Sequence, residues 1–193
     1  MMKKTLLTAS LTLISYLLQA QSVCEDVHRG VHLQIISKEF NDLPSNPILD
    51  TVEKRYFPLT SVLTCFFLLQ SNITNEQETR VVYQRVRDIA VKYIQTDTLI
   101  LLTDYYNSGK VTEIFNGFAS KYRLRYISMG GDCCGGKVWE AMEYFNQQME
   151  CHLIDINGKD WKKQFYADLE AYYNEQLSQM SRKERKKIIK NNY

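Results

Sequence analysis

The residues best suited to chemistry stand in segment 130–136, which reads Gly-Gly-Asp-Cys-Cys-Gly-Gly. The segment lies between an expected strand and an expected helix, so it would join the carboxyl end of one to the amino end of the other. Open α/β sheets bind ligands at that edge. Free backbone N–H groups there favour anions and lower the pKa of a thiol. The candidate binding residues are therefore Gly131, Asp132, Cys133, Cys134, Gly135 and Lys137.

The doubled cysteine also has a structural interpretation. The chain has five cysteines, an odd number, so pairing in an oxidising compartment leaves at least one thiol without a disulfide partner in the chain. Cys133 and Cys134 pair with each other only with strain, because adjacent Cα atoms lie about 3.8 Å apart, closer than a disulfide usually spans. Cys151 or Cys24 is then the expected partner. A structural disulfide is the favoured interpretation, and a reactive thiol in the glycine-rich loop is the alternative.

Other candidate chemistry is sparse. Cys24, His28 and His32 are spaced by four, which on a helix would place three metal ligands on one face. Gly30 interrupts that spacing and His32 falls in an expected strand, so we expect no metal site. The sequence also lacks a Gly-x-Ser-x-Gly elbow, a Walker loop and a His-Glu-x-x-His motif. These observations favour a binding role over an enzyme and predict no cofactor.

The amino terminus has the three-part layout of a secretory signal peptide. Lys3 and Lys4 precede a mainly apolar stretch over 6–18, and Ala20 occupies the small-residue position that signal peptidase recognises. An apolar stretch of about 13 residues is too short for a helix to cross the hydrocarbon core of a membrane. We therefore expect residues 1–20 to be removed after Ala20. The expected product is a secreted or periplasmic bacterial protein with no transmembrane segment in its mature chain.

The charges of the chain limit its partners. Lys and Arg number 24 against 22 Asp and Glu, and losing Lys3 and Lys4 with the signal peptide makes the mature chain nearly neutral. We therefore expect no nucleic acid as a partner. Basic residues concentrate in the tail 181–193, which could contact an anionic cell-envelope surface such as phosphorylated lipid or polysaccharide. These residues are Arg182, Lys183, Arg185, Lys186, Lys187 and Lys190.

Hydrophobic periodicity predicts the elements of the first half. Alternation over 31–37 predicts a strand, and the apolar, partly aromatic run over 59–69 predicts a second, buried strand. A helix is expected between them, stopped by Pro58, and a longer amphipathic helix extends to residue 94. The residues that mark the starts of these two helices are Asn46, Pro47 and either Thr74 or Asn75.

The second half alternates strands and helices. The expected strands cover 98–103 and 124–129, and the expected helices cover 111–122, 138–153 and 161–180. Caps are expected at Asp160 for the last of these helices and at Ser181, with Glu184, for a short basic helix. Alternation with short connections predicts an α/β fold with a mainly parallel sheet and two C-terminal helices; α+β with a small mixed sheet is the alternative. The length fits a single domain over 21–180.

Three short motifs stand in this half. Segment 118–122 reads Phe-Ala-Ser-Lys-Tyr, segment 145–149 reads Phe-Asn-Gln-Gln-Met, and segment 157–161 reads Asn-Gly-Lys-Asp-Trp. In them the chain, over about 98–180, resembles the FEKKY domain family of small secreted bacterial proteins, whose motifs are Phe-Glu-Lys-Lys-Tyr, Tyr-Asn-x-x-Met and Asn-Gly-Lys-Asp-Trp. The chain departs from that pattern in the Ala-Ser pair, in Phe145 and in its doubled cysteine. The family carries no assigned activity, so the resemblance implies one secreted domain and no particular chemistry.

These observations predict a secreted or periplasmic binding or interaction module. The missing catalytic motifs, the near-neutral charge and the many tyrosines support that prediction. The alternative is a thiol-redox or metal-binding protein that uses the loop with Cys133 and Cys134. Replacing both cysteines by serine would separate the two hypotheses.

Overall fold

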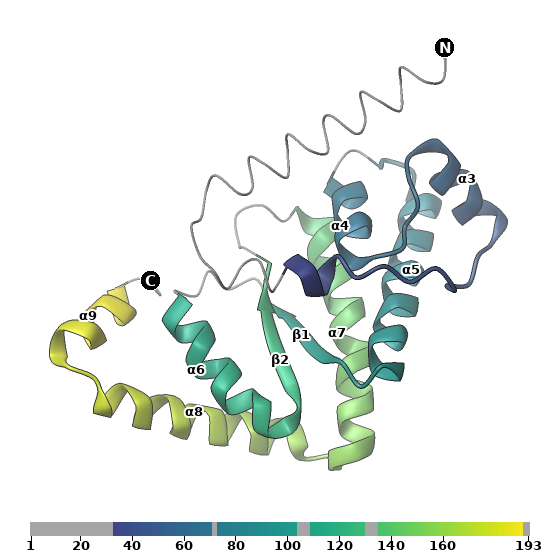
Figure 1. Cartoon of the computed structure of the whole chain (residues 1–193). Coiled ribbons are helices and arrows are strands. Elements are labelled where there is room, and N and C mark those ends of the chain that lie inside the picture. The colour runs from purple at the N-terminus through teal and green to yellow at the C-terminus, as the bar shows by residue number, and fades with distance from the viewer. Residues whose placement is uncertain (1–32, 71–72, 104–108, 130–134, 191–193) are drawn as a thin grey trace. The chain divides into compact units, whose positions relative to one another are not determined.

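The computed structural model describes residues 33–70, 73–103, 109–129 and 135–190, with side chains left out at 109–112 and 187–190. The chain divides into two compact units, Met1–Val31 and His32–Tyr193, and every described residue belongs to the second. Within it a short helical turn over 33–36 precedes the elements shown in Figure 1. These are α3 (Pro47–Arg55), α4 (Val62–Gln70), α5 (Glu76–Gln95), β1 (Leu99–Thr103), α6 (Gly109–Ala119), the 3-10 turn η1 (Ser120–Tyr122), β2 (Leu124–Ser128), α7 (Gly136–Asn157), α8 (Trp161–Gln179) and α9 (Arg182–Lys190).

The centre of this unit is a small parallel sheet inside a fold that helices dominate. In the described residues the sheet has two strands, β1 and β2, paired in register from Leu99 opposite Leu124 to Thr103 opposite Ser128. Helix α6 lies between the strands in the chain, and α7 follows β2, so the order is strand, helix, strand, helix. The mixed α/β class and the parallel pairing are therefore confirmed. Helices α7 and α8 are the two long helices expected near the end of the chain.

Two predicted strands are wrong, because both segments are helical. Residues 33–36 form a helical turn instead of the strand expected over 31–37, and Ile36 is buried in the core. The run expected as a strand over 59–69 folds as α4, which buries Val62, Cys65, Phe66, Leu68 and Leu69. A short helix covered on most sides is apolar nearly all round, so periodicity cannot distinguish it from a buried strand.

A local signal for α4 was present in the sequence. The hydroxyl of Ser61 accepts a hydrogen bond from the N–H of Thr64 at 3.2 Å, and the hydroxyl of Thr64 accepts one from the N–H of Ser61 at 3.1 Å. This reciprocal arrangement satisfies two backbone donors at a helix start, as a capping box does. A Ser-x-x-Thr pattern ahead of an apolar run therefore favoured a helix.

Most of the other predicted helix starts are confirmed. The side chain of Asn46 accepts from the N–H groups of Ile48 and Leu49, and Pro47 is the first residue of α3. Asn75 does the same for α5. Ser181 and Glu184 form the reciprocal bonds expected ahead of α9. Asp160 stands directly before α8, but its side chain makes no capping bond.

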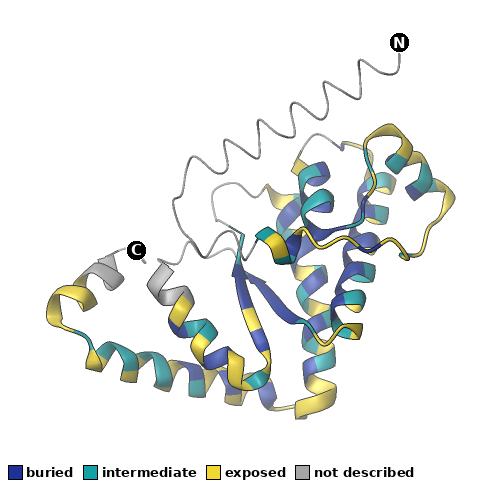
Figure 2. Ribbon diagram, viewed as in Figure 1, coloured by how far each residue is buried: buried dark blue, intermediate teal, exposed yellow. Residues whose placement is uncertain are grey.

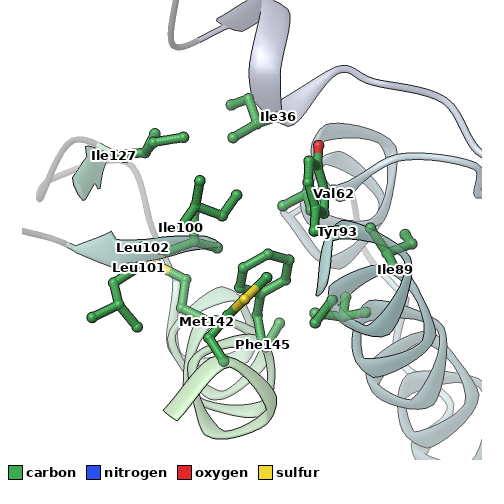
Figure 3. Close-up of a cluster of buried hydrophobic side chains, with 14 of the residues drawn as sticks. Ile36, Val62, Ile89, Tyr93, Ile100, Leu101, Leu102, Ile127, Met142 and Phe145 are labelled. Atoms are coloured by element: carbon green, nitrogen blue, oxygen red, sulfur yellow. The ribbon is translucent and has the colours of Figure 1, made fainter. Parts of the chain in front are cut away.

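One face of the sheet builds the larger part of the core. Ile100 of β1 and Ile127 of β2 face a cluster that contains Tyr93 of α5 and Phe145 of α7, as Figure 3 shows. The ring of Tyr93 packs edge-on against Phe145, with centroids 5.9 Å apart, and is fully buried. Figure 2 shows burial concentrated in the strands and on the inward sides of α5 and α7. This core holds β1 in place beside α7.

The opposite face of the sheet packs against α6 and α8. Phe165 of α8 is fully buried there, with ring centroids 5.3 Å from Phe118 and 5.0 Å from Tyr122. The same ring meets Trp161 at 5.6 Å and Tyr126 of β2 at 6.3 Å. An aromatic cluster around Phe165 therefore attaches α8 to the strand–helix–strand unit.

Candidate functional site

Two asparagines cover the outer edges of the sheet. The side chain of Asn146, on α7, accepts a hydrogen bond from the N–H of Leu102 and donates one to its C=O, both at 2.8 Å. Asn116, on α6, accepts from the N–H of Tyr126 at 2.7 Å and donates to its C=O at 3.1 Å. Each amide therefore pairs with strand backbone as a neighbouring strand would. This satisfies edge groups that would otherwise invite another strand, and it fixes α6 and α7 beside the sheet.

A cavity of about 300 Å³ lies over the sheet face that carries Leu101 and Tyr126. Because side chains alternate along a strand, Thr103 and Ser128 at the carboxyl ends of β1 and β2 line the same cavity. The remaining walls come from α6, α7 and α8. The cavity therefore reaches the carboxyl ends of the two parallel strands, the edge at which α/β sheets bind ligands.

Helix α7 supplies a second stripe of residues to this cavity. Trp139, Glu143, Asn146 and Glu150 all line it, at spacings of four, three and four residues. That spacing places them on one side of the helix. The expected apolar stripe of α7, from Val138 to Leu153, is buried in the core, and of its members Met142 also lines the cavity. The cavity stripe was missed because its mixed aromatic, acidic and amide composition matches no periodic hydrophobic pattern.

The hydroxyl of Tyr126 is the most unusual polar group of the cavity. It is buried and makes no hydrogen bond of ordinary geometry with the described residues. Burial, and secondarily the neighbouring Tyr166, raises the pKa of Tyr126, so the phenol is neutral at physiological pH. A buried hydroxyl without a partner costs free energy, commonly about 1–3 kcal/mol. The oxygen is closed off from solvent, so a ligand reaches it only if a neighbouring side chain such as Tyr166 moves.

The two carboxylates that line the cavity differ in their surroundings. Glu150 receives the ammonium of Lys162, with Nζ at 2.7 and 2.8 Å from its two oxygens. Glu143 is exposed at the rim and makes no ion pair with a described residue. None of the described residues that line the cavity is Lys, Arg or His. The carboxylate of Glu143 is therefore solvated and lies on a cavity lined by no cationic side chain of the described residues.

The candidate residues predicted from the glycine-rich segment are placed only in part. Gly131, Asp132, Cys133 and Cys134 lie outside the described residues. The elements on either side are as expected, because β2 ends at Ser128 and Gly135 is the N-cap of α7. The ammonium of Lys137 donates to the backbone carbonyl of Ile73, so this positive charge is engaged with the protein itself. Gly135 is exposed, and neither residue lines the cavity.

Cys151 is one of the two partners expected for the doubled cysteine, with Cys24 as the alternative; Cys24, Cys133 and Cys134 lie outside the described residues. Cys151 lies near the carboxyl end of the helix, about 22 Å along its axis from Gly136 at a rise of 1.5 Å per residue. A disulfide requires Cα atoms within about 7 Å. A disulfide between Cys151 and a residue at the start of α7 is therefore excluded. Cys151 is an exposed free thiol.

Cys65 is the other described cysteine, and it is fully buried in α4. Burial raises the pKa of its thiol far above the usual value, despite the opposing effect of nearby Arg85. Such a thiol is unreactive at neutral pH. Cys65 therefore serves as a small apolar core residue.

The remaining expectations about ligands fall largely outside the described part of the chain. Cys24, His28 and His32 are not described. Within the described ranges, no group of three His, Cys, Asp or Glu side chains is placed to hold a metal ion. The same ranges contain no helix that is both long and apolar enough to cross a membrane.

The residues that carry the FEKKY resemblance pack in the core, pair with a sheet edge or end a helix. Phe118 packs in the aromatic cluster around Phe165, and Asn146 covers the edge of β1. Gly158 ends α7 with φ at +91°, a conformation that favours glycine, and Trp161 is buried at the start of α8. These motifs hold the fold together around the cavity. No protein-family model matches the chain, and neither does any curated protein or solved structure.

Proposed function

We propose that this chain is a secreted or periplasmic binding protein whose ligand is a small molecule held in the cavity beside β1 and β2. The observation that supports it best is Tyr126, which lines a cavity of about 300 Å³ and whose buried hydroxyl makes no hydrogen bond of ordinary geometry with a described residue. Ligand cavities typically combine apolar walls with a few polar groups and measure about 300–1,000 Å³. The cavity has that composition and lies at the low end of that range.

The proposed location rests on the amino-terminal sequence. A charged start, an apolar stretch over 6–18 and Ala20 form the layout that signal peptidase recognises. The mass of the exported protein tests this part of the proposal, because cleavage after Ala20 leaves Gln21 as the first residue. We also propose that the part over about 98–180 is related to the FEKKY domains, because its motif residues occupy the structural positions described above.

A fragment screen on the mature chain tests the cavity. We expect fragments to perturb the fluorescence of Trp139, which lines the cavity, and to shift amide signals of β1, β2 and α7 in NMR spectra. Tyr126→Phe should weaken fragments that pair with the hydroxyl by about tenfold, the value of one hydrogen bond. The same change should leave the melting temperature unchanged or raise it, because it removes an unpaired polar atom.

Two controls show whether binding depends on the cavity and not on another part of the chain. Tyr56→Phe removes the hydroxyl of a half-exposed tyrosine that does not line the cavity, so it should leave fragment binding unchanged. Replacing Cys133 and Cys134 by serine tests the alternative function, in which the glycine-rich loop acts through its thiols. Shifts that avoid the cavity, or equal affinities for the wild type and Tyr126→Phe, would count against the proposal. Loss of binding only in the double serine variant would favour the thiol alternative.

We further propose that α9 contacts anionic lipid. Residues 182–186 are exposed, and the carboxylate of Glu184 is bound by the backbone N–H and hydroxyl of Ser181. Among the described residues, no ion pair neutralises the cations of this segment. Four of these cations are Arg182, Lys183, Arg185 and Lys186. A cluster of basic side chains on a helix is the usual means of binding an anionic leaflet.

Vesicle co-sedimentation checks this second proposal. We expect binding to vesicles that contain phosphatidylglycerol, little binding to pure phosphatidylcholine, and release in 0.5 M salt at about 4 Å screening length. Changing the four cations to glutamine should lower the affinity at least tenfold, given about 1 kcal/mol per cation near the surface. The matched control changes four exposed cations elsewhere, namely Lys54, Arg80, Lys159 and Lys163. Equal losses in both variants, or binding to anionic polysaccharide but not to the vesicles, would contradict the proposal.

A further inference from the structure

We propose that the ligand of the cavity is an organic cation of the ammonium class. This inference rests on the proposed function and specifies the chemistry of the same site. Three features of the cavity support it: the charge of its walls, the aromatic rings around it and the unpaired hydroxyl at its side.

The charge of the walls favours a cation. Glu143 and Glu150 are the ionisable carboxylates among the lining residues, and no Lys, Arg or His lines the cavity within the described chain. Lys162 approaches from α8 and neutralises Glu150 through both carboxylate oxygens. Glu143 remains without an ion pair among the described residues. A ligand anion would therefore meet repulsion, whereas a cation would gain a modest favourable contact with this solvated carboxylate.

Aromatic rings reach the cavity from four different elements. Phe115 comes from α6, Tyr126 from β2, Trp139 from α7 and Tyr166 from α8. The faces of such rings attract cations, and quaternary ammonium groups are commonly held by several rings at once. Tyr166 is 44 % exposed, so part of this ring surface is open to solvent. An apolar ligand would also contact these rings, but it would gain no electrostatic contact with Glu143.

The hydroxyl of Tyr126 adds a polar contact. It is buried next to Tyr166, makes no hydrogen bond of ordinary geometry with a described residue, and can either donate or accept one. An ammonium ion that carries an N–H or a hydroxyl group could satisfy it. The combination of rings, one unpaired carboxylate and one unpaired hydroxyl matches a small amino alcohol better than a hydrocarbon of equal size.

Choline and its uncharged carbon analogue 3,3-dimethylbutan-1-ol provide the test. The two molecules have nearly the same shape and the same hydroxyl, so they differ mainly in charge. Calorimetry or tryptophan fluorescence on the mature chain gives both affinities. We expect choline to bind about three- to tenfold more tightly than the neutral analogue. That ratio corresponds to a cation–π contact with the rings together with a weak ion pair with an exposed carboxylate.

Three variants test the preference for choline: one should lower it, one should raise it and one is a control. Glu143→Gln removes the unpaired carboxylate and should abolish most of the preference for choline. Lys162→Gln frees the carboxylate of Glu150 and should increase that preference by about threefold. Glu170→Gln changes an exposed carboxylate of α8 outside the cavity and should have no effect. The affinity for the neutral analogue should stay constant in all three proteins, which separates an effect on charge from a loss of folding.

The outcomes distinguish this inference from the proposed function. Equal affinity for the two probes, with amide shifts at the cavity, would overturn the cation preference and leave the binding site in place. A Lys162→Gln protein that binds choline no better than the wild type would also contradict it. If neither probe binds while fragments still perturb the cavity, the ligand is not an ammonium ion of this size. If nothing binds at the cavity, the proposed function itself fails.

Discussion

Replacing Phe165 by alanine is expected to lower the free energy of unfolding by about 3–5 kcal/mol, the usual cost of removing a fully buried phenylalanine. Its ring lies within 5.0–5.6 Å of Tyr122, Phe118 and Trp161, measured between centroids. The cavity left behind cannot close easily, because its neighbours belong to α6, η1 and α8. Urea unfolding followed by circular dichroism measures the loss.

Two further variants bracket this prediction. Phe165→Leu keeps most of the volume and should cost clearly less, about 1–1.5 kcal/mol. Tyr56→Ala removes an aromatic ring that is 39 % exposed and should change stability by no more than about 1 kcal/mol. If Phe165→Ala costs less than 1 kcal/mol, α8 is not attached to the sheet through this ring. The cavity wall that α8 provides would then lose its support.

Replacing Asn146 by alanine is expected to cost about 2–4 kcal/mol, because it removes both partners of the Leu102 backbone at once. Each buried backbone group left without a partner costs about 1–3 kcal/mol, and water from the adjacent cavity can recover part of it. Asn146→Asp should be no better than alanine. It keeps an acceptor for the N–H of Leu102 but places a carboxylate oxygen against the C=O of Leu102.

Hydrogen exchange gives a specific measure of this effect. The amide of Leu102 should exchange much faster in Asn146→Ala, whereas the amide of Thr103 should change less, because Thr103 faces β2 and its carbonyl accepts from Met129 at 2.8 Å. Gln147→Ala provides the control, since Gln147 is the exposed neighbour on the same helix. Unchanged exchange at Leu102 in the Asn146 variant would show that the side-chain amide does not protect this edge.

The two predictions together explain why motif residues of this chain need not be ligand contacts. Asn146 lines the cavity, yet both of its polar groups are occupied by the sheet edge. Phe118 and Trp161 contribute to the cluster around Phe165. These residues hold α6, α7 and α8 beside the sheet. The ligand contacts that we propose, at Tyr126, Glu143 and Trp139, stand outside or between the motifs.

The sequence predicted structure correctly wherever the backbone hydrogen bonds of a segment are satisfied by residues close to it in the chain. Asn46, Asn75 and Ser181 cap helices through backbone groups two or three residues away, so their roles follow from local spacing. The same holds for the turn at Gly158 and for the alternation of β1, α6, β2 and α7. It failed at α4, because a run that is apolar on nearly every side carries no period that separates a helix from a strand.

By itself, then, the sequence determined most of the helix caps, the strand–helix–strand–helix order and the parallel class of the sheet, because these depend on neighbours along the chain. Only the tertiary structure decided that α7 presents a second stripe to a cavity, and that asparagines on α6 and α7 close both sheet edges. It also decided that Cys151 stands at the far end of α7 from the glycine-rich segment. Each of these depends on which distant segments meet, and that is set by packing across the whole core rather than by local spacing.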